Sequence, residues 1–230
     1  MRLLNECITL YRIKALRDFG DVKAGDLGGF VENESNLSHD GNCWIYDEAK
    51  AYDNAVVNMN SQMYDYSEIH GSVELNNYVK LYDRVNLYCL NEDELLLYEY
   101  VELHDDVIMN CTGNIGDYVK ISDYVKINGN IYITGHVKIS DNVIINGDFT
   151  ASDHVKIRDY AEITGNVNLY DHVEIFDKAK LSGDTKMYDY SKIHDKGSTS
   201  GTTELHDHAE ILGDGYAMSD ILHHYDIIKY

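Results

Sequence analysis

The chain has 230 residues, of which 44% are hydrophobic and 26% charged, a composition typical of a folded protein and not of a disordered one. Its formal net charge of −21 excludes extensive direct contact with nucleic acid, because phosphate binding depends on Lys and Arg. No apolar run approaches the roughly 18 residues of a membrane helix, and the charged start of the chain does not resemble a signal peptide. We therefore expect a cytoplasmic protein without membrane contact.

The first 38 residues show no fixed period. Within them, "ITLYRIKALRDF" is interpreted as a strand, and "GDVKAGDLGGFV" is rich in Gly, which is typical of turns. A repeat begins after residue 38, and the open end of a repeat structure needs a cap. We therefore predict an N-terminal cap over residues 1–38 that covers the first coil.

Residues 39–217 carry a six-residue repeat. From Asp117 to Gly213 every sixth residue, 17 positions in succession, is Asp or Gly. A small or β-branched residue follows two places later and an aliphatic residue four places later, as in Val119 and Ile121. Alternate residues of a strand point to the same side, so both of these face inward, while Asp or Gly turns the chain. The unit Asp/Gly-x-Val-x-Ile-x therefore predicts one short side of a coil.

The spacing of the turn residues predicts the number of sides. Two columns recur every 18 positions: Gly129, Gly147, Gly165, Gly183 and Gly201, and Asp105, Asp123, Asp141, Asp159, Asp177 and Asp195. The chain thus returns to the same corner after three sides of six residues. We predict an all-β fold, a single-stranded parallel β-helix with a triangular cross-section and about ten coils.

The solenoid has one clear interruption, near residues 88–92. The turn residue Asp83 is followed by Asp93 after ten positions, where six or twelve are expected, so "LYCLNED" contains four extra residues. The final stretch, "YAMSDILHHYDIIKY", is apolar and aromatic. We predict that residues 218–230 form a C-terminal tail or cap, and that any homo-oligomer forms through this segment.

The hexads, for example "ISDNVIINGD", resemble those of the hexapeptide-repeat family, the left-handed β-helix acyltransferases. The stretch "DFGDVKAGDLGGFVENESNLSHDGNCWIYDEA" is similar to bacterial and phage-encoded members named as acyltransferase-like proteins. The resemblance implies a left-handed coil. It also implies an acyltransferase with a general-base His beside a loop that interrupts the coils, and a groove for acyl-CoA. The interruption of this chain contains no His, the nearest being His104, and no basic groove for CoA phosphates is evident.

One column of the repeat consists of residues with aromatic rings: Tyr118, His136, His154, His172, Tyr190 and His208. Neighbouring coils would place these rings about 5 Å apart, so we predict a stack along one corner. A metal-binding or pH-responsive ladder is the alternative, but a straight column does not bring three or four ligands together. The turn Asp residues are predicted to accept hydrogen bonds from their own turn backbone.

We expect neither a metal nor a cofactor. The four cysteines, Cys7, Cys43, Cys89 and Cys111, lie far apart and have no C-x-x-C spacing. They are therefore interpreted as reduced thiols and not as a disulfide framework or a zinc site.

Negative charge is concentrated before residue 118. Residues 41–117 carry 15 acidic and 3 basic side chains, against 12 and 9 in residues 118–195. The segment "EDELLLYEYVELHDD" directly follows the interruption and has seven acids and no Lys or Arg. A field of one sign steers partners of opposite charge, and outward tyrosines add contact area, although an acidic face also serves solubility alone. We predict a partner-binding surface made of Glu92, Asp93, Glu94, Tyr98, Tyr100, Glu102, Asp105 and Asp106.

These observations favour a non-enzymatic interaction protein that binds a basic protein surface. A specific form is a phage-type inhibitor, or a nucleic-acid mimic that binds a host nucleic-acid-binding protein. Two alternatives stay open. One is a hexapeptide-repeat acyltransferase that uses acyl-CoA, and the other is a structural or self-assembling module, because poorly capped β-helix ends can stack.

Overall fold

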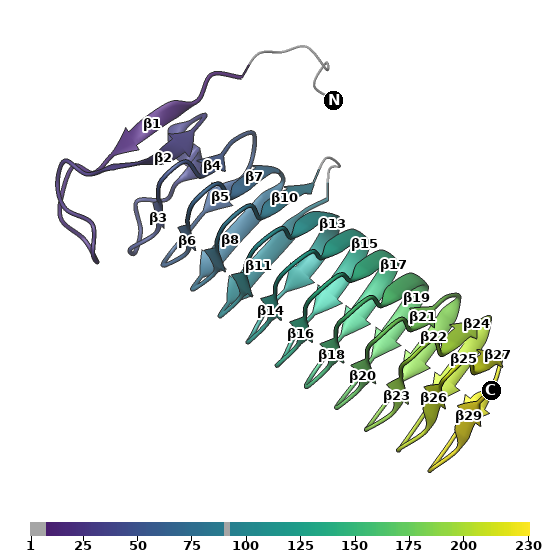
Figure 1. Ribbon diagram of the computed structural model, residues 1–230. Helices are drawn as coiled ribbons and strands as arrows, with labels where there is room; N and C mark the ends of the chain where they lie inside the picture. Colours follow the sequence, from purple (N-terminus) through teal and green to yellow (C-terminus); the bar gives the residue numbers. More distant parts are fainter. Residues whose placement is uncertain (1–7, 90–92) are drawn as a thin grey trace.

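The computed structural model describes residues 8–89 and 93–230. They form an elongated parallel β-solenoid of about 11 turns, with about 18 residues in each turn and almost no helix (Figure 1). The predicted fold class is thereby confirmed. The helical element among the described residues is a short 3-10 turn, η1 (Glu34–Asn36), and no helix in this part of the chain is long and apolar enough to cross a membrane.

The solenoid has three faces, which we name A, B and C in the order in which the chain visits them. Face C is an 11-stranded parallel sheet with one short strand from each coil. Its strands are β3 (Trp44–Ile45), β6 (Gln62–Met63), β9 (Lys80–Leu81), β12 (Glu102–Leu103), β14 (Lys120–Ile121), β16 (Lys138–Ile139), β18 (Lys156–Ile157), β20 (Glu174–Ile175), β23 (Lys192–Ile193), β26 (Glu210–Leu212) and β29 (Ile227–Lys229).

Faces A and B belong to an 18-stranded sheet. Face A contains β4 (Lys50–Ala51), β7 (Glu68–Gly71), β10 (Asn86–Cys89), β21 (Lys180–Leu181), β24 (Ser198–Ser200) and β27 (Tyr216–Met218). Face B contains β5 (Val56–Val57), β8 (Val73–Asn77), β11 (Leu95–Glu99), β22 (Asp184–Met187), β25 (Thr202–Leu205) and β28 (Ile221–Leu222). Four longer strands bend from face A into face B: β13 (Ile108–Ile115), β15 (Lys126–Ile133), β17 (Ile144–Ala151) and β19 (Glu162–Leu169).

The core fills the space between the faces, as the repeat predicts. Val137 and Ile139 are at most 1% exposed, and the equivalent residues of neighbouring coils stack on them. Among the described residues, Phe149 is the largest fully buried side chain. The outward residues between these positions stay accessible, so each strand buries alternate residues as pleated geometry requires.

The corners form three edges that run along the solenoid. The Asp edge, between faces C and A, is made of Asp47, Asp65, Asp83, Asp105, Asp123, Asp141, Asp159, Asp177 and Asp195, all with positive φ. The Gly edge, between faces A and B, includes Gly71, Gly129, Gly147, Gly165, Gly183 and Gly201. At Gly147 φ is 129°, and an added Cβ would lie 2.2 Å from the carbonyl oxygen of Gly165. Only glycine fits where the backbone is so twisted and successive coils approach so closely.

The third edge, between faces B and C, carries aromatic rings and is named the ring edge. Its members are Tyr78, Tyr100, Tyr118, His136, His154, His172, Tyr190, His208 and Tyr225. Each follows a turn residue of positive φ, such as Asp153 before His154. The corner therefore turns at this residue and points the next side chain outward.

A hairpin covers the N-terminal end. β1 (Tyr11–Lys14) pairs antiparallel with β2 (Leu27–Val31), which pairs parallel with β4 of the first coil (Figure 1). Gly28 and Gly29 allow the close approach, since added Cβ atoms would lie 2.5 and 2.3 Å from the carbonyl oxygens of Ile45 and Ala49. The Gly-rich stretch is thus partly strand, and it seats the hairpin on the solenoid.

The opposite end continues the solenoid into residues 218–230. β28 pairs with β25, and β29 pairs with β26, both in parallel. Among the described residues, β27, β28 and β29 each pair on one side only. The segment predicted as a tail or cap is therefore the last coil, and its strand edges are open.

Candidate functional site

The interruption of the repeat lies at the Gly edge. β10 pairs with β7 up to Cys89, and β11 resumes pairing with β8 at Leu95. The carbonyl oxygen of Glu94 accepts the Gly113 amide, which returns the chain to register. Across this coil the Asp edge advances 22 residues, from Asp83 to Asp105. The four extra residues therefore fall between Cys89 and Leu95, at the corner between faces A and B, and residues 90–92 lie outside the described part.

The predicted partner-binding residues do not share one face. Glu92 lies outside the described residues. Asp93 and Glu94 are exposed at the Gly edge, and Tyr98 on face B is half-buried against Gly116. The remaining four residues follow the chain onward: Tyr100 at the ring edge, Glu102 on face C, and Asp105 and Asp106 at the Asp edge. The segment winds around the solenoid, so one flat partner cannot contact all of it.

Several of these charges are neutralised locally. Both carboxylate oxygens of Asp106 accept hydrogen bonds from the Arg84 guanidinium at 2.6 Å. This pairing lowers the pKa of Asp106 and raises the pKa of Arg84. Glu102 lies 3.5 Å from the ammonium of Lys120 and 3.5 Å from Nε2 of His104. The net negative charge around the folded segment is therefore smaller than its count of acidic residues suggests, because Arg84 and Lys120 lie beside two of its carboxylates.

The Asp edge is a continuous carboxylate ladder. Each carboxylate accepts the backbone N–H of the equivalent residue in the next coil, at 3.1–3.4 Å, through nine successive bonds. Asp117, Asp189 and Asp207 do the same beside the ring edge. We predicted that each Asp accepts a hydrogen bond from its own turn, and this was wrong: the donor is a backbone N–H of the next coil. The bonds run along the solenoid axis and hold successive coils together.

The rings of the ring edge stack face to face, as predicted for the histidine column. Centroids of successive rings are 4.7–5.2 Å apart from Tyr78 to Tyr225. The stack is longer than predicted. Tyr100 extends the column by one coil, Tyr78 lies beyond the interruption and is 22 residues from Tyr100, and Tyr225 lies in the final coil. Stacked planes direct the histidine nitrogens side by side and not toward a common centre.

His70 is a residue that the sequence analysis missed. Its ring stacks between those of Tyr52 and Tyr88 on face A, at 4.8 and 5.2 Å. Nδ1 lies 3.9 Å from a carboxylate oxygen of Asp53. Burial lowers the pKa of His70, which favours the neutral imidazole that a general base needs. It lies next to Gly71, one coil before the interruption, and its 18-residue spacing from both tyrosines was the available signal.

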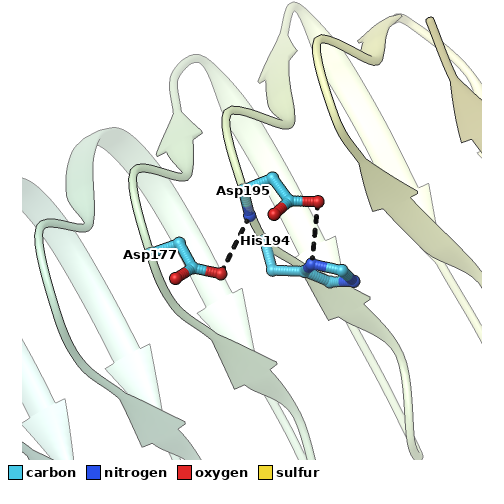
Figure 2. A group of neighbouring side chains, drawn as sticks. All are labelled: Asp177, His194 and Asp195. Atoms are coloured by element: carbon cyan, nitrogen blue, oxygen red, sulfur yellow. Dashed lines mark hydrogen bonds and ion pairs between the residues drawn. The ribbon is translucent and has the colours of Figure 1, made fainter.

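One histidine and two carboxylates form a second candidate site, at the Asp edge (Figure 2). Asp177, His194 and Asp195 bring one potential metal ligand each within 4.8 Å of the others. Nδ1 of His194 is 3.3 Å from Asp195, and Nε2 is 2.6 Å from Glu210. Asp177 accepts the Asp195 amide as part of the Asp edge (Figure 2). Hydrogen bonds within the solenoid therefore account for this cluster.

Comparison with known proteins adds one finding. No protein-family model matches the chain. A 67-residue segment, 29% of the chain, is 42% identical to a protein of Escherichia coli strain K12 named "Uncharacterized acetyltransferase YdcK". The matched segment spans 21% of that relative. Together with the six-residue repeat and the three-sided solenoid, this similarity fits a hexapeptide-repeat family with acyltransferase-like relatives.

Proposed function

We propose that the chain is a rigid acidic interaction protein that binds a basic protein surface along the Asp edge. The observation that supports this proposal is the carboxylate ladder, in which nine Asp residues follow one another at one-coil spacing. A line of like charges about 5 Å apart attracts cationic side chains at long range and accelerates their association. Its position on a solenoid keeps the charges in fixed register, so binding costs little ordering entropy.

The form of the partner follows from the spacing. A nucleic-acid mimic would have to reproduce phosphates that advance about 3.4 Å along each DNA strand, whereas coils advance about 4.8 Å. A basic protein surface imposes no such period, because Lys and Arg side chains adapt to the carboxylates. The proposal therefore favours a basic protein, in the cytoplasm, over the narrower role of a phage-type inhibitor that imitates nucleic acid.

Asparagine substitutions test the proposal, since Asn keeps an oxygen acceptor and tolerates positive φ. One variant replaces Asp105, Asp123, Asp141 and Asp159 by Asn. A matched control replaces the same number of carboxylates beside the ring edge: Asp153, Asp171, Asp189 and Asp207. We expect the first variant to weaken binding of a compact basic protein, cytochrome c, by about tenfold more than the control. Equal losses would mean that net charge alone matters and would overturn the proposal.

Acetyl transfer is the second candidate, favoured by the similarity to the protein named as an acetyltransferase and by His70. A neutral His70 beside Asp53 would accept a proton from the acceptor's hydroxyl or amine as that group attacks the acetyl thioester. The test is acetyl-CoA titration and turnover with His70→Gln, with His172→Gln on the ring edge as control. Saturable binding together with a loss of turnover confined to His70→Gln would support this candidate. Without binding, it is excluded.

A further inference from the structure

A cavity of about 610 Å³ lies at the N-terminal end, between the hairpin and the first turn of the solenoid. Its volume falls within the roughly 300–1,000 Å³ typical of small-molecule sites. Neither His70 nor any residue of the Asp edge lines it, so neither proposed function uses it. Most of its lining comes from residues 13–38, which show no fixed period.

The floor of this cavity is apolar and aromatic. It is lined by Ile13, Phe19, Val31, Leu37, Cys43 and Trp44. Phe19 packs edge-to-face on Trp44, with ring centroids 5.5 Å apart. Gly28 packs closely against the indole, since an added Cβ would lie 2.7 Å from Cζ2 of Trp44. These contacts fix the rings in place, so the floor is formed before any ligand arrives.

The rim carries two cations. Lys14 and Arg17 line the cavity, are exposed, and form no ion pair with any residue in the described part of the chain. The acid at the rim, Glu34, is engaged by Nε2 of His39 at 3.0 Å. Residues 1–38 carry 6 acidic and 5 basic side chains, so nearly all of the net charge of −21 lies beyond the cap. The cap is therefore the part of this acidic chain where an anion meets the least repulsion.

We propose that this cavity binds a small anionic amphiphile, a carboxylate with a hydrocarbon tail. The tail would lie against Phe19 and Trp44, where burial of apolar surface is favourable. The carboxylate would meet Arg17 and Lys14 at the rim, and a guanidinium can hold a carboxylate through two parallel hydrogen bonds. A neutral amphiphile would gain the first interaction alone, and a cationic one would be repelled at the rim.

Trp44 is the single tryptophan of the chain, so its fluorescence reports on the cavity without a label. The full chain is titrated with decanoate below its micelle concentration, and in parallel with decanol and decylamine. We expect a saturable change with decanoate and binding at least about tenfold weaker for the other two. Isothermal titration calorimetry provides the same comparison independently of the reporter.

Three variants test whether the ligand binds in this cavity. Lys14→Gln combined with Arg17→Gln removes the rim cations and should weaken decanoate binding by about tenfold, to the level of decanol. Lys23→Gln combined with Lys196→Gln changes the net charge equally, at exposed lysines paired with Asp18 and Asp214, and should leave it unchanged. Ser38→Phe, which fills the cavity, should abolish binding of both. The proposal is overturned if decanoate does not saturate, if decanol binds as tightly, or if the control pair loses as much affinity as the rim pair.

Discussion

The Asp edge makes a quantitative prediction at Asp141, in the middle of the solenoid. Asp141 has a φ of 70°, and one carboxylate oxygen accepts the Asp159 amide at 3.4 Å. Substitution by Asn, Gly or Ala separates the two requirements of this position. Asn keeps the acceptor and tolerates the backbone, Gly keeps only the backbone freedom, and Ala keeps neither.

The magnitudes follow from these losses. Removal of the hydrogen bond to the Asp159 amide costs about 0.5–1.5 kcal/mol. The Ser140 hydroxyl, which donates to the same oxygen at 2.8 Å, is only partly buried and can bond water instead. A left-handed conformation costs Ala about 1–2 kcal/mol more. We therefore expect Ala to reduce the free energy of unfolding by about 2–3 kcal/mol and Gly by about 1–2 kcal/mol. Asn should differ by less than about 0.5 kcal/mol at high salt. At low salt Asn should stabilise, because each neighbouring carboxylate at one-coil spacing repels Asp141 by about 0.9 kcal/mol in unscreened water.

Urea unfolding monitored by circular dichroism measures the order of the three variants. Hydrogen exchange at the Asp159 amide provides a local measurement that does not require all coils to unfold together. Faster exchange at this amide in Gly and Ala, but not in Asn, is the expected result. If Asn destabilises as much as Ala, or if the Asp159 amide is unaffected in all three, the ladder does not stabilise the coils and the reasoning fails.

Three further predictions concern other parts of the chain. Gly147→Ala should destabilise by more than about 3 kcal/mol, because a left-handed backbone and a clash with backbone atoms add. Gly201→Ala, at φ 66°, places its Cβ closest to the Ser219 hydroxyl, a side-chain atom that can move, and should cost about 1–2 kcal/mol in urea unfolding. Because burial lowers the pKa of His70, the unfolded chain takes up this proton first. Its contribution is thus complete above about pH 6.5 and lost as the pH falls, and His70→Gln should flatten that part of the stability profile. Burial raises the pKa of Cys43 to about 11, so in a Cys7→Ser background the folded protein should react slowly with a thiol reagent and quickly in urea.

The solenoid could be predicted from the sequence because the six-residue spacing of turn residues and the alternation of inward residues determine its geometry. Val137 and Ile139 are inward for the same reason in every coil, and the Gly147 corner needs a residue without Cβ. The final coil was not predicted, since its turns are formed by Ser219 and His224, which adopt positive φ without being Asp or Gly. A repeat defined by Asp or Gly at the turn positions therefore ended one coil before the solenoid does.

The candidate sites were less predictable, because neighbours in space are 18 residues apart and not adjacent in sequence. Glu94, Glu102 and Asp106 are close in sequence and were predicted to form one surface. The coil instead places Glu94 at the Gly edge, Glu102 on face C and Asp106 at the Asp edge. The local pairing of Asp106 with Arg84 spans 22 residues across the interruption, so no local pattern indicated it. The direction of each Asp carboxylate, along the axis and not into its own turn, depends on side-chain rotamers that the spacing does not specify.

The same geometry constrains what this molecule can recognise. A repeat that places one residue type in each column builds lines, such as the Asp edge and the ring edge, and a line of identical groups supplies attraction without much selectivity. Selectivity then has to come from departures from the repeat, where unlike side chains meet. The described chain offers two such places, the residues flanking the interruption at the Gly edge and the cavity beneath the hairpin. We therefore expect the Asp edge to govern how fast a basic partner associates, and substitutions at Glu94 or around Trp44 to govern which ligand is retained.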